Sequence, residues 1–104
     1  MYNNIVYDKG LAIANGSSAV AFNFKGGRLV LAGGGTFGGG TIGLEWTQDG
    51  TTWFPLGPQN TVVTTLGAAG SSMFYAAPGR YRVVVAGTTA PSLAYWVGDA
   101  QTGA

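Results

Sequence analysis

Apolar and polar residues alternate along most of the chain, and this alternation is the strongest structural signal in the sequence. The clearest examples are "GRLVLAG" at residues 27–33 and "RYRVVVA" at residues 80–86. A period of two is typical of a half-buried strand, and no segment sustains the 3.6-residue period of a helix. Gly, Pro or Asp-Gly separates the segments, as turns require. The predicted strands lie near 11–14 and at 18–25, 27–33, 41–48, 51–56, 61–66, 71–76, 80–86 and 92–98.

Short strands at roughly ten-residue spacing are typical of antiparallel folds built from two sheets. We therefore expect an all-β chain, an antiparallel β-sandwich that is jelly-roll-like and has about eight short strands. A length of 104 residues suits one domain. We expect an N-terminal arm and short first strand at 1–17, the sandwich at 18–98 and a C-terminal tail at 99–104.

The stretch "EWTQDGTTWFPL" at residues 45–56 has three possible interpretations: an Asp-box of a sugar-cleaving propeller, a metal-binding loop, or a β-hairpin. The Asp-box has one more residue between Asp and Gly, and a propeller needs repeats that this chain lacks. A calcium loop needs several carboxylates at alternate positions, whereas Asp49 stands alone. We therefore favour a hairpin that turns at Asp49-Gly50.

The loop length of this hairpin decides which side chains share a face. A two-residue loop would place Leu44 opposite Pro55, whereas a three-residue loop places Leu44 opposite Phe54 and pairs apolar with apolar residues. The three-residue loop also puts Gly50 where a left-handed conformation is needed, with Asp49 capping the turn. The predicted inward residues are Ile42, Leu44, Trp46, Phe54 and Leu56, and the predicted outward neighbours are Trp53 and Glu45.

The segment "GGGTFGGGT" at residues 33–41 is dense in glycine and invites comparison with a phosphate-binding loop. It lacks the lysine of that motif and no helix is predicted after it, so we interpret it as an inter-strand loop or a close approach of another backbone. The chain has no His and no Cys, which removes the usual general base and the thiol nucleophile. We therefore expect a non-enzymatic protein with no catalytic residue, cofactor or metal.

Charged residues make up only 9% of the chain, against about 25% in an ordinary soluble domain. With 46% apolar residues, a free monomer has little charge to oppose association, so we expect a permanent oligomer or part of a larger assembly. The net charge is +1 and the Lys and Arg residues are scattered, so we expect no nucleic-acid partner. We also expect no membrane partner, since no segment reaches about 18 apolar residues, and no signal peptide.

Outward positions of the predicted strands combine Arg with large apolar side chains. If the alternation places Leu29 and Tyr81 inward, then Arg28, Arg80 and Arg82 point outward. Trp and Arg are enriched at protein interfaces, so these positions predict a partner surface; the alternative is that loops cover both sheet faces. The predicted outward apolar residues are Val30, Trp53, Phe74, Val84 and Trp96.

Between residues 18 and 97 the chain presents a "KGGR" strand pair at 25–28, a "DG…W" hairpin at 49–53, a "PGRYRV" strand at 78–83 and a "PSL" strand at 91–93. This order resembles small all-β structural proteins of tailed bacteriophages. The resemblance implies a head decoration (cement) protein on the capsid surface of the virion, assembled in the host cytoplasm. It implies a jelly-roll or related sandwich, often a trimer, that binds the major capsid protein and has no active site. Similar modules also occur in tail and fibre proteins.

Under this interpretation the segment "MYNNIVYDKG" is an arm that contacts a capsid subunit or a sister protomer; the alternative is a frayed terminus. The alternative function is a carbohydrate- or receptor-binding β-sandwich module of a tail or fibre, in which the rings of Trp53, Tyr95 and Trp96 stack on sugars. The candidate interface residues are Tyr2, Ile5, Tyr7, Arg28, Trp53, Arg80, Arg82 and Trp96.

Overall fold

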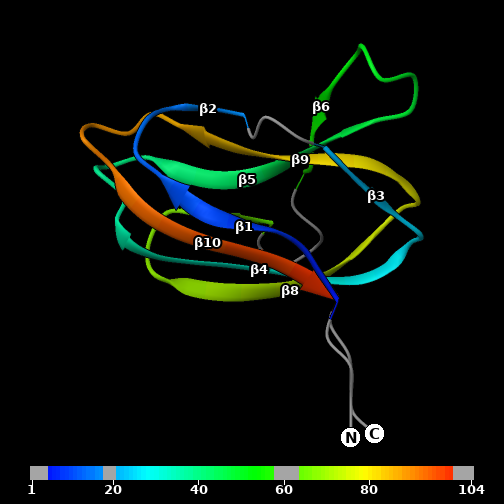
Figure 1. The fold of residues 1–104 in the computed structure, drawn as a ribbon, viewed down its shortest axis with the longest axis horizontal. Coiled ribbons are helices and arrows are strands. Elements are labelled where there is room, and N and C mark those ends of the chain that lie inside the picture. Colours follow the sequence, from blue (N-terminus) through cyan, green and yellow to red (C-terminus); the bar gives the residue numbers. More distant parts are fainter. Residues whose placement is uncertain (1–4, 18–20, 58–63, 100–104) are drawn as a thin grey trace, which may run out of the picture.

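The computed structural model describes residues 5–17, 21–57 and 64–99. Every regular element in these ranges is a β-strand, and the strands form two antiparallel sheets that pack face to face (Figure 1). The strands are β1 (Val6–Ala12), β2 (Gly16–Ser17), β3 (Phe22–Phe24), β4 (Gly27–Thr36), β5 (Thr41–Thr47), β6 (Phe54–Pro55), β7 (Thr65–Leu66), β8 (Gly70–Ala76), β9 (Gly79–Ala86) and β10 (Ser92–Asp99).

The strand order is that of a jelly roll. The first sheet has the order β1-β10-β4-β8, and the second has the order β2-β9-β5-β6, with β3 also paired to β9 and β7 also paired to β5. Short strands β2 and β3 share one edge of the second sheet, because both pair with the side of β9 that faces away from β5. The chain thus passes repeatedly from one sheet to the other, as two interlocked Greek keys require. The predicted fold class is confirmed.

The strands from β4 onward lie near the predicted ranges, but β4 continues to Thr36 and β6 is limited to Phe54–Pro55. The larger differences lie in the N-terminal segment. The first strand begins at Val6 instead of near residue 11, so residues 6–10 of the expected arm are part of the first sheet. A β-bulge between Val6 and Asp8 shifts the register and places Tyr7 and Asp8 on the inner side together. This insertion breaks the period-two pattern, which is why alternation did not reveal the strand.

The core lies between the two sheets and is built from the inward positions of the alternating segments. Leu29, Leu31 and Val83 are buried, as the alternation predicted. Tyr81 is completely buried, and its hydroxyl donates a hydrogen bond to the carbonyl oxygen of Ala77 at 2.7 Å. The rings of Phe22 and Phe24 pack on Tyr81, stacked and edge-on respectively, and Tyr7 packs in turn on both of them.

Phe74 was predicted to point outward, and this prediction is wrong because its side chain is only 2% exposed. Strand β8 pairs with β4 so that Phe74 lies opposite Leu29, whose side chain is in the core. Met73 and Tyr75, on either side of Phe74, therefore point outward. Three consecutive large apolar residues give no alternation from which to choose the buried one.

The β5–β6 hairpin has neither of the two registers considered from the sequence. Trp46 lies opposite Phe54, and the Leu56 amide donates to the Leu44 carbonyl oxygen at 3.0 Å. The loop is two residues longer than the preferred three-residue loop, which keeps the same residues on the inner side. Gly50 has the predicted positive φ, at 85°.

Phe54 has the predicted inward facing, but its side chain stays 55% exposed. The tip of the β5–β6 hairpin projects beyond the rest of the sandwich (Figure 1), so the first sheet does not cover this part of its inner side. A residue can therefore face inward as predicted and still be exposed to solvent, if the opposite sheet does not extend over it.

Glycines of the segment 33–41 lie against the backbone of the loop between β9 and β10. The Thr89 amide donates to the Gly38 carbonyl oxygen at 3.0 Å, and a Cβ added to Gly40 would lie 2.6 Å from the Thr88 nitrogen. The interpretation that another backbone approaches this segment closely is confirmed.

Candidate interaction surface

The outer side of the first sheet carries mostly apolar side chains, and the pairing register defines which ones. Trp96 on β10 lies between Lys9 on β1 and Ala32 on β4, and Val30 on β4 lies opposite Met73 on β8. We name this surface the apolar face. Its residues are Val6, Lys9, Leu11, Arg28, Val30, Ala32, Ser71, Met73, Tyr75, Ala94, Trp96 and Gly98.

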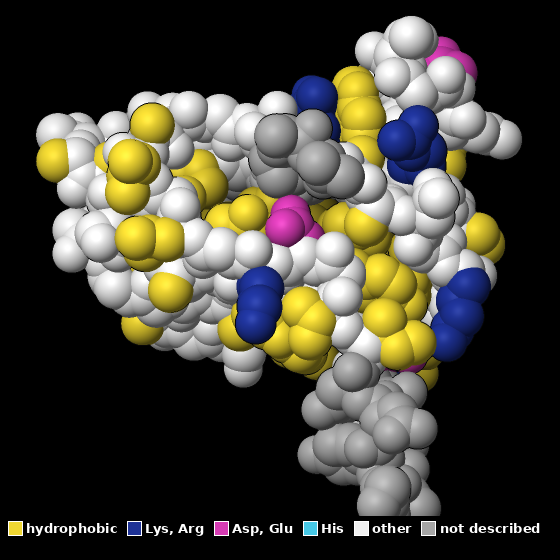
Figure 2. Space-filling view, in the orientation of Figure 1, with side chains coloured by type: hydrophobic (Ala, Val, Ile, Leu, Met, Phe, Trp, Pro, Cys, Tyr) yellow, Lys and Arg dark blue, Asp and Glu magenta, His cyan; other side chains and the backbone are white. Residues whose placement is uncertain are grey.

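Four of the exposed large hydrophobic residues of the described chain lie on the apolar face. They are Val6 and Leu11 at the β1 edge and Met73 and Tyr75 at the β8 edge, with exposed fractions from 43% to 67%. Hydrophobic side chains gather along β1 and β10 in Figure 2, beside a dark blue cation. A contiguous apolar surface of this kind marks an interaction site more often than scattered single residues do.

Trp96 is fixed in the centre of this face by a glycine. A Cβ added to Gly98 would lie 2.6 and 2.8 Å from Cζ2 and Cζ3 of Trp96, so the indole lies over the bare backbone of Gly98. The ring is half-buried as a result. It adds a broad apolar surface whose position is set before any partner binds.

The charged side chains on the apolar face are both cations, Lys9 and Arg28. The four side-chain carboxylates of the sequence all lie elsewhere. Asp8 and Asp99 lie on the inner side of the first sheet, opposite Val97 and Leu29 respectively, and Asp99 forms an ion pair with Lys25 at 3.4 Å. Glu45 and Asp49 belong to the second sheet and its hairpin.

The outer side of the second sheet carries an ion pair between two of its own side chains. Arg82 donates from Nε and Nη2 to Glu45 Oε1 at 2.7 and 2.6 Å, and its guanidinium lies 4.2 Å from the ring centroid of Trp53. The predicted neighbours Trp53 and Glu45 do lie on this side. Each of them interacts with Arg82, Trp53 through a cation–π contact and Glu45 through an ion pair. Arg80 is exposed on the same side.

Asp49 organises the turn that joins β5 to β6. Its Oδ1 accepts hydrogen bonds from the Thr52 and Thr51 amides, both at 2.8 Å, and from the Thr47 hydroxyl at 3.1 Å. The backbone donors of Thr52 and Thr51 hold the pKa of Asp49 well below its usual value of 3.8. The predicted capping role is confirmed, and the cap extends the loop to residue 52, which explains the longer register.

We expect the variant Asp49→Asn to flatten the acid dependence of stability. Because the pKa of Asp49 is lower in the folded protein than in the unfolded chain, its carboxylate stabilises the fold above pH 3.8, and this contribution disappears as the pH falls through the depressed value. The free energy of unfolding, measured by urea titration at several acidic pH values, should therefore fall more steeply for the wild type. Parallel curves for the two proteins would contradict this assignment.

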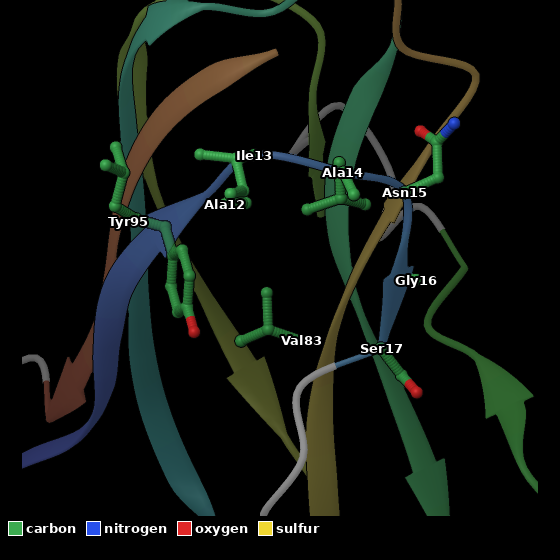
Figure 3. Close-up of a pocket in the computed structure, with 10 residues that line it drawn as sticks. Ala12, Ile13, Ala14, Asn15, Gly16, Ser17, Val83 and Tyr95 are labelled. Atoms are coloured by element: carbon green, nitrogen blue, oxygen red, sulfur yellow. The ribbon is translucent and has the colours of Figure 1, made fainter. Parts of the chain in front are cut away.

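A hollow of about 250 Å³ opens between the sheets at the edge formed by β1 and β2 (Figure 3). The link from Ala12 to Ser17 crosses above it, while Tyr95 and Val83 point into it (Figure 3). Burial, followed by the nearby Asp8 carboxylate that hydrogen-bonds its hydroxyl, raises the pKa of Tyr95. Tyr95 therefore faces the interior, and its predicted role as a sugar-stacking ring is not compatible with this position.

The predicted interface residues do not form one surface. Arg28 and Trp96 share the apolar face, and exposed Ile5 adjoins it through a hydrogen bond from the Asp99 amide to its carbonyl oxygen. Tyr7 was predicted to contact a partner, but it packs on the core. Tyr2 lies outside the described residues. The remaining three residues, Trp53, Arg80 and Arg82, belong to the second sheet.

The residues that the sequence analysis missed are Leu11, Met73 and Tyr75, which contribute much of the exposed apolar surface. Their facing depends on the pairing of β1 with β10 and of β8 with β4, because neither edge strand shows clean alternation. Once the pairing is known, a side chain directly opposite an outward residue must also point outward: Arg28 identifies Tyr75 and Val30 identifies Met73. Ala94 identifies Leu11 in the same way.

Comparison of the chain with protein-family models, with curated proteins and with solved structures gives no match in any of the three. Within residues 5–17, 21–57 and 64–99, no three His, Cys, Asp or Glu side chains are grouped in a way that could hold a metal ion. The same part of the chain contains no helix long and apolar enough to span a membrane. A function has to be inferred from the residues and geometry of the chain itself.

Proposed function

We propose that this chain is a non-enzymatic structural protein of a virion, a decoration protein that binds the outer capsid surface through the apolar face and bridges capsid subunits. The observation that carries the proposal is the contrast between the two sheets: the outer side of the second sheet pairs Arg82 with Glu45, whereas that of the first sheet exposes apolar side chains together with Lys9 and the half-buried Arg28. The jelly-roll strand order is consistent with this role, since that architecture recurs in viral capsid domains.

A sheet surface suits permanent docking. Its backbone is already ordered by strand pairing, and Trp96 is fixed over Gly98, so binding has few groups left to immobilise. Burial of apolar surface contributes roughly 25 cal/mol for each Å² removed from water, before the costs of association. The exposed side chains of Leu11, Met73 and Tyr75 would supply much of that surface.

Charge indicates what the partner surface carries. The two cations of the apolar face lie on different strands. Lys9 is on edge strand β1, and Arg28 is on β4 beside Tyr75. A second copy docked face to face would offer neither cation a carboxylate, because the apolar face carries none. We therefore infer a different protein as the partner, namely the major capsid protein, with carboxylates that face Lys9 and Arg28.

The test is co-sedimentation with capsids assembled from the major capsid protein encoded in the same genome. The wild type should bind, and the double variant Lys9→Glu/Arg28→Glu should bind at least about 100-fold more weakly, because reversed charges would face partner carboxylates. Arg80→Glu is the matched control, since Arg80 is exposed on the opposite sheet and should leave binding unchanged. Circular dichroism and urea unfolding check that each variant folds.

The outcomes separate the function from the surface. Absence of the wild type from sedimented capsids would count against a decoration role altogether. Equal binding by the wild type and the double variant would keep that role and reject the apolar face as the docking surface. Homo-oligomerisation, with a trimer favoured, stays a prediction that light scattering across a dilution series tests.

A further inference from the structure

The projecting part of the β5–β6 hairpin presents the inner side of the second sheet to solvent. Along this side the facing pairs run from the core toward the tip: Leu44 with Leu56, then Trp46 with Phe54. Leu44 is buried and Trp46 is half-buried, whereas Phe54 is exposed. The core of the sandwich thus continues into an aromatic pair that the first sheet does not cover.

Two hollows meet at this aromatic pair. One, of about 340 Å³, lies toward the tip, and the other, of about 300 Å³, lies toward the core; Trp46 and Phe54 line both. These volumes reach the lower end of the usual range for small-ligand sites. The hollow toward the tip is lined by Trp46, Gln48, Asp49, Thr52 and Phe54.

Trp46 is held in a fixed position beneath these hollows. Its indole Nε1 donates to the Pro78 carbonyl oxygen at 3.1 Å. A Cβ added to Gly79 would lie 2.9 and 3.0 Å from Cδ1 and Cε2 of Trp46, so the ring packs directly on the glycine backbone. With Phe54 on the neighbouring strand, it forms a preorganised aromatic platform, which lowers the entropic cost of binding a flat apolar surface.

The polar side chains at the rim offer both donors and acceptors. Asp49 is fully exposed and presents a carboxylate, one oxygen of which is used by the turn. The amide of Gln48 and the hydroxyl of Thr52 can each donate and accept. An aromatic platform bordered by an acceptor-rich rim matches a sugar ring, whose C–H face is apolar and whose edge carries hydroxyl groups.

We propose that this hollow is a saccharide-binding site, in which a neutral pyranose packs on Phe54 and Trp46 and hydrogen-bonds through its hydroxyls to Asp49, Gln48 and Thr52. A neutral ligand fits better than an anionic one because the carboxylate of Asp49 lines the hollow. The Arg80 guanidinium lies close to Gly50, 3.8 Å from where its Cβ would be, and Gly50 adjoins Asp49. An anionic ligand would be repelled by the Asp49 carboxylate, whereas Arg80 lies on the outer side of the sheet and does not line the hollow.

This site differs from the one that the sequence suggested for sugar binding. One face of Trp53 is covered by Arg82, and Tyr95 points between the sheets. The site also lies on a different sheet from the apolar face, so it does not depend on the proposed capsid contact.

The experiment starts from a glycan array that carries neutral hexose and N-acetylhexosamine oligosaccharides beside sialylated ones. The strongest neutral binder is then titrated while the indole N–H signals of the three tryptophans are followed by NMR. We expect the Trp46 signal to shift and those of Trp53 and Trp96 to stay in place. Phe54→Ala should weaken binding by at least about tenfold, since it removes half of the platform.

Tyr75→Ala is the matched control, because Tyr75 is an exposed aromatic residue on the other sheet and should not affect the titration. Gln48→Ala removes a rim amide without touching the platform and should weaken binding to a smaller extent. Three results would overturn the proposal: no glycan binds, Phe54→Ala binds as tightly as the wild type, or tetramethylammonium shifts the Trp46 signal while no sugar does. In the last case the hollow would be a cation site.

Discussion

Replacement of Gly40 with alanine is expected to lower the free energy of unfolding by about 3 kcal/mol. The new Cβ would collide with the carbonyl oxygen of Ala86 and lie 2.6 Å from the Thr88 nitrogen. Both groups are backbone atoms, one in the last residue of β9 and one in the loop that follows, so no side-chain rotation can relieve the overlap. Urea titration measures the loss directly, and the melting temperature should fall by about 4 °C or more for each kcal/mol.

The same glycine-rich segment supplies two matched controls. Gly34 has an ordinary φ and nothing within 4 Å of its would-be Cβ, so Gly34→Ala should leave stability almost unchanged. Gly39 is also open but has a φ of 82°, so Gly39→Ala should cost about 1 kcal/mol through backbone strain alone. If Gly40→Ala proved no more harmful than Gly39→Ala, close packing of the two loops would not be what requires a glycine at position 40.

Truncation of Tyr81 to alanine is expected to cost about 3–5 kcal/mol, the second large effect. The ring is completely buried, stacks on Phe22 with centroids 5.9 Å apart and meets Phe24 edge-on at 6.1 Å. Its removal leaves a cavity in the part of the core that contains Phe22 and Phe24 and against which Tyr7 packs. Chemical unfolding monitored by circular dichroism would measure the loss, and a loss below about 1 kcal/mol would contradict the central place of this ring.

Tyr81→Phe separates the hydroxyl from the ring. It keeps the aromatic packing and removes the hydrogen bond to the Ala77 carbonyl oxygen, so it should cost only about 1–2 kcal/mol. Tyr75→Ala is the exposed control: Tyr75 is 67% accessible on the apolar face, and its truncation should change stability by about 0.5 kcal/mol or less.

The fold could be predicted from the sequence wherever alternation was clean. In β4 and β9 large apolar residues occupy alternate positions over part of the strand, and both strands have the predicted facing. These residues are Leu29, Leu31, Tyr81, Val83 and Val85. The strand boundaries follow because Gly, Pro and Asp-Gly interrupt the pattern. Prediction failed at β1, where a bulge adds one residue to the repeat, and at Phe74, whose neighbours are equally apolar.

The hairpin register illustrates a second limit. Sequence pattern fixes the parity of facing residues, and Leu44, Trp46 and Leu56 do face inward as predicted. It does not fix the loop length, which here depends on the hydrogen bonds that Asp49 accepts from Thr51 and Thr52. A shift of two residues preserves parity, so the error left no trace in the hydrophobic pattern.

The candidate surfaces were harder to predict than the fold. Arg82 and Trp53 have the outward facing expected of interface residues, and Arg82 contacts both Trp53 and Glu45 of its own chain. Long side chains find their partners across strands, and alternation within a single strand carries no information about that. The exposure of the aromatic pair of Trp46 and Phe54 could not be predicted for a related reason. The pair is accessible because the first sheet ends before the hairpin does, and a single strand's sequence does not show where the opposite sheet ends.

The hydrogen bond between the Asp99 amide and the Ile5 carbonyl oxygen determines how the domain would respond to mechanical load. These residues lie at the adjacent ends of antiparallel neighbours β1 and β10, so tension applied at Ile5 and Asp99 would pull the two strands apart sideways. The inter-strand bonds would then break one after another, as in a zipper, instead of sharing the force as they do in shear. A protein attached through its ends would yield at low force, whereas one attached through the face of its first sheet would carry load across the whole sheet.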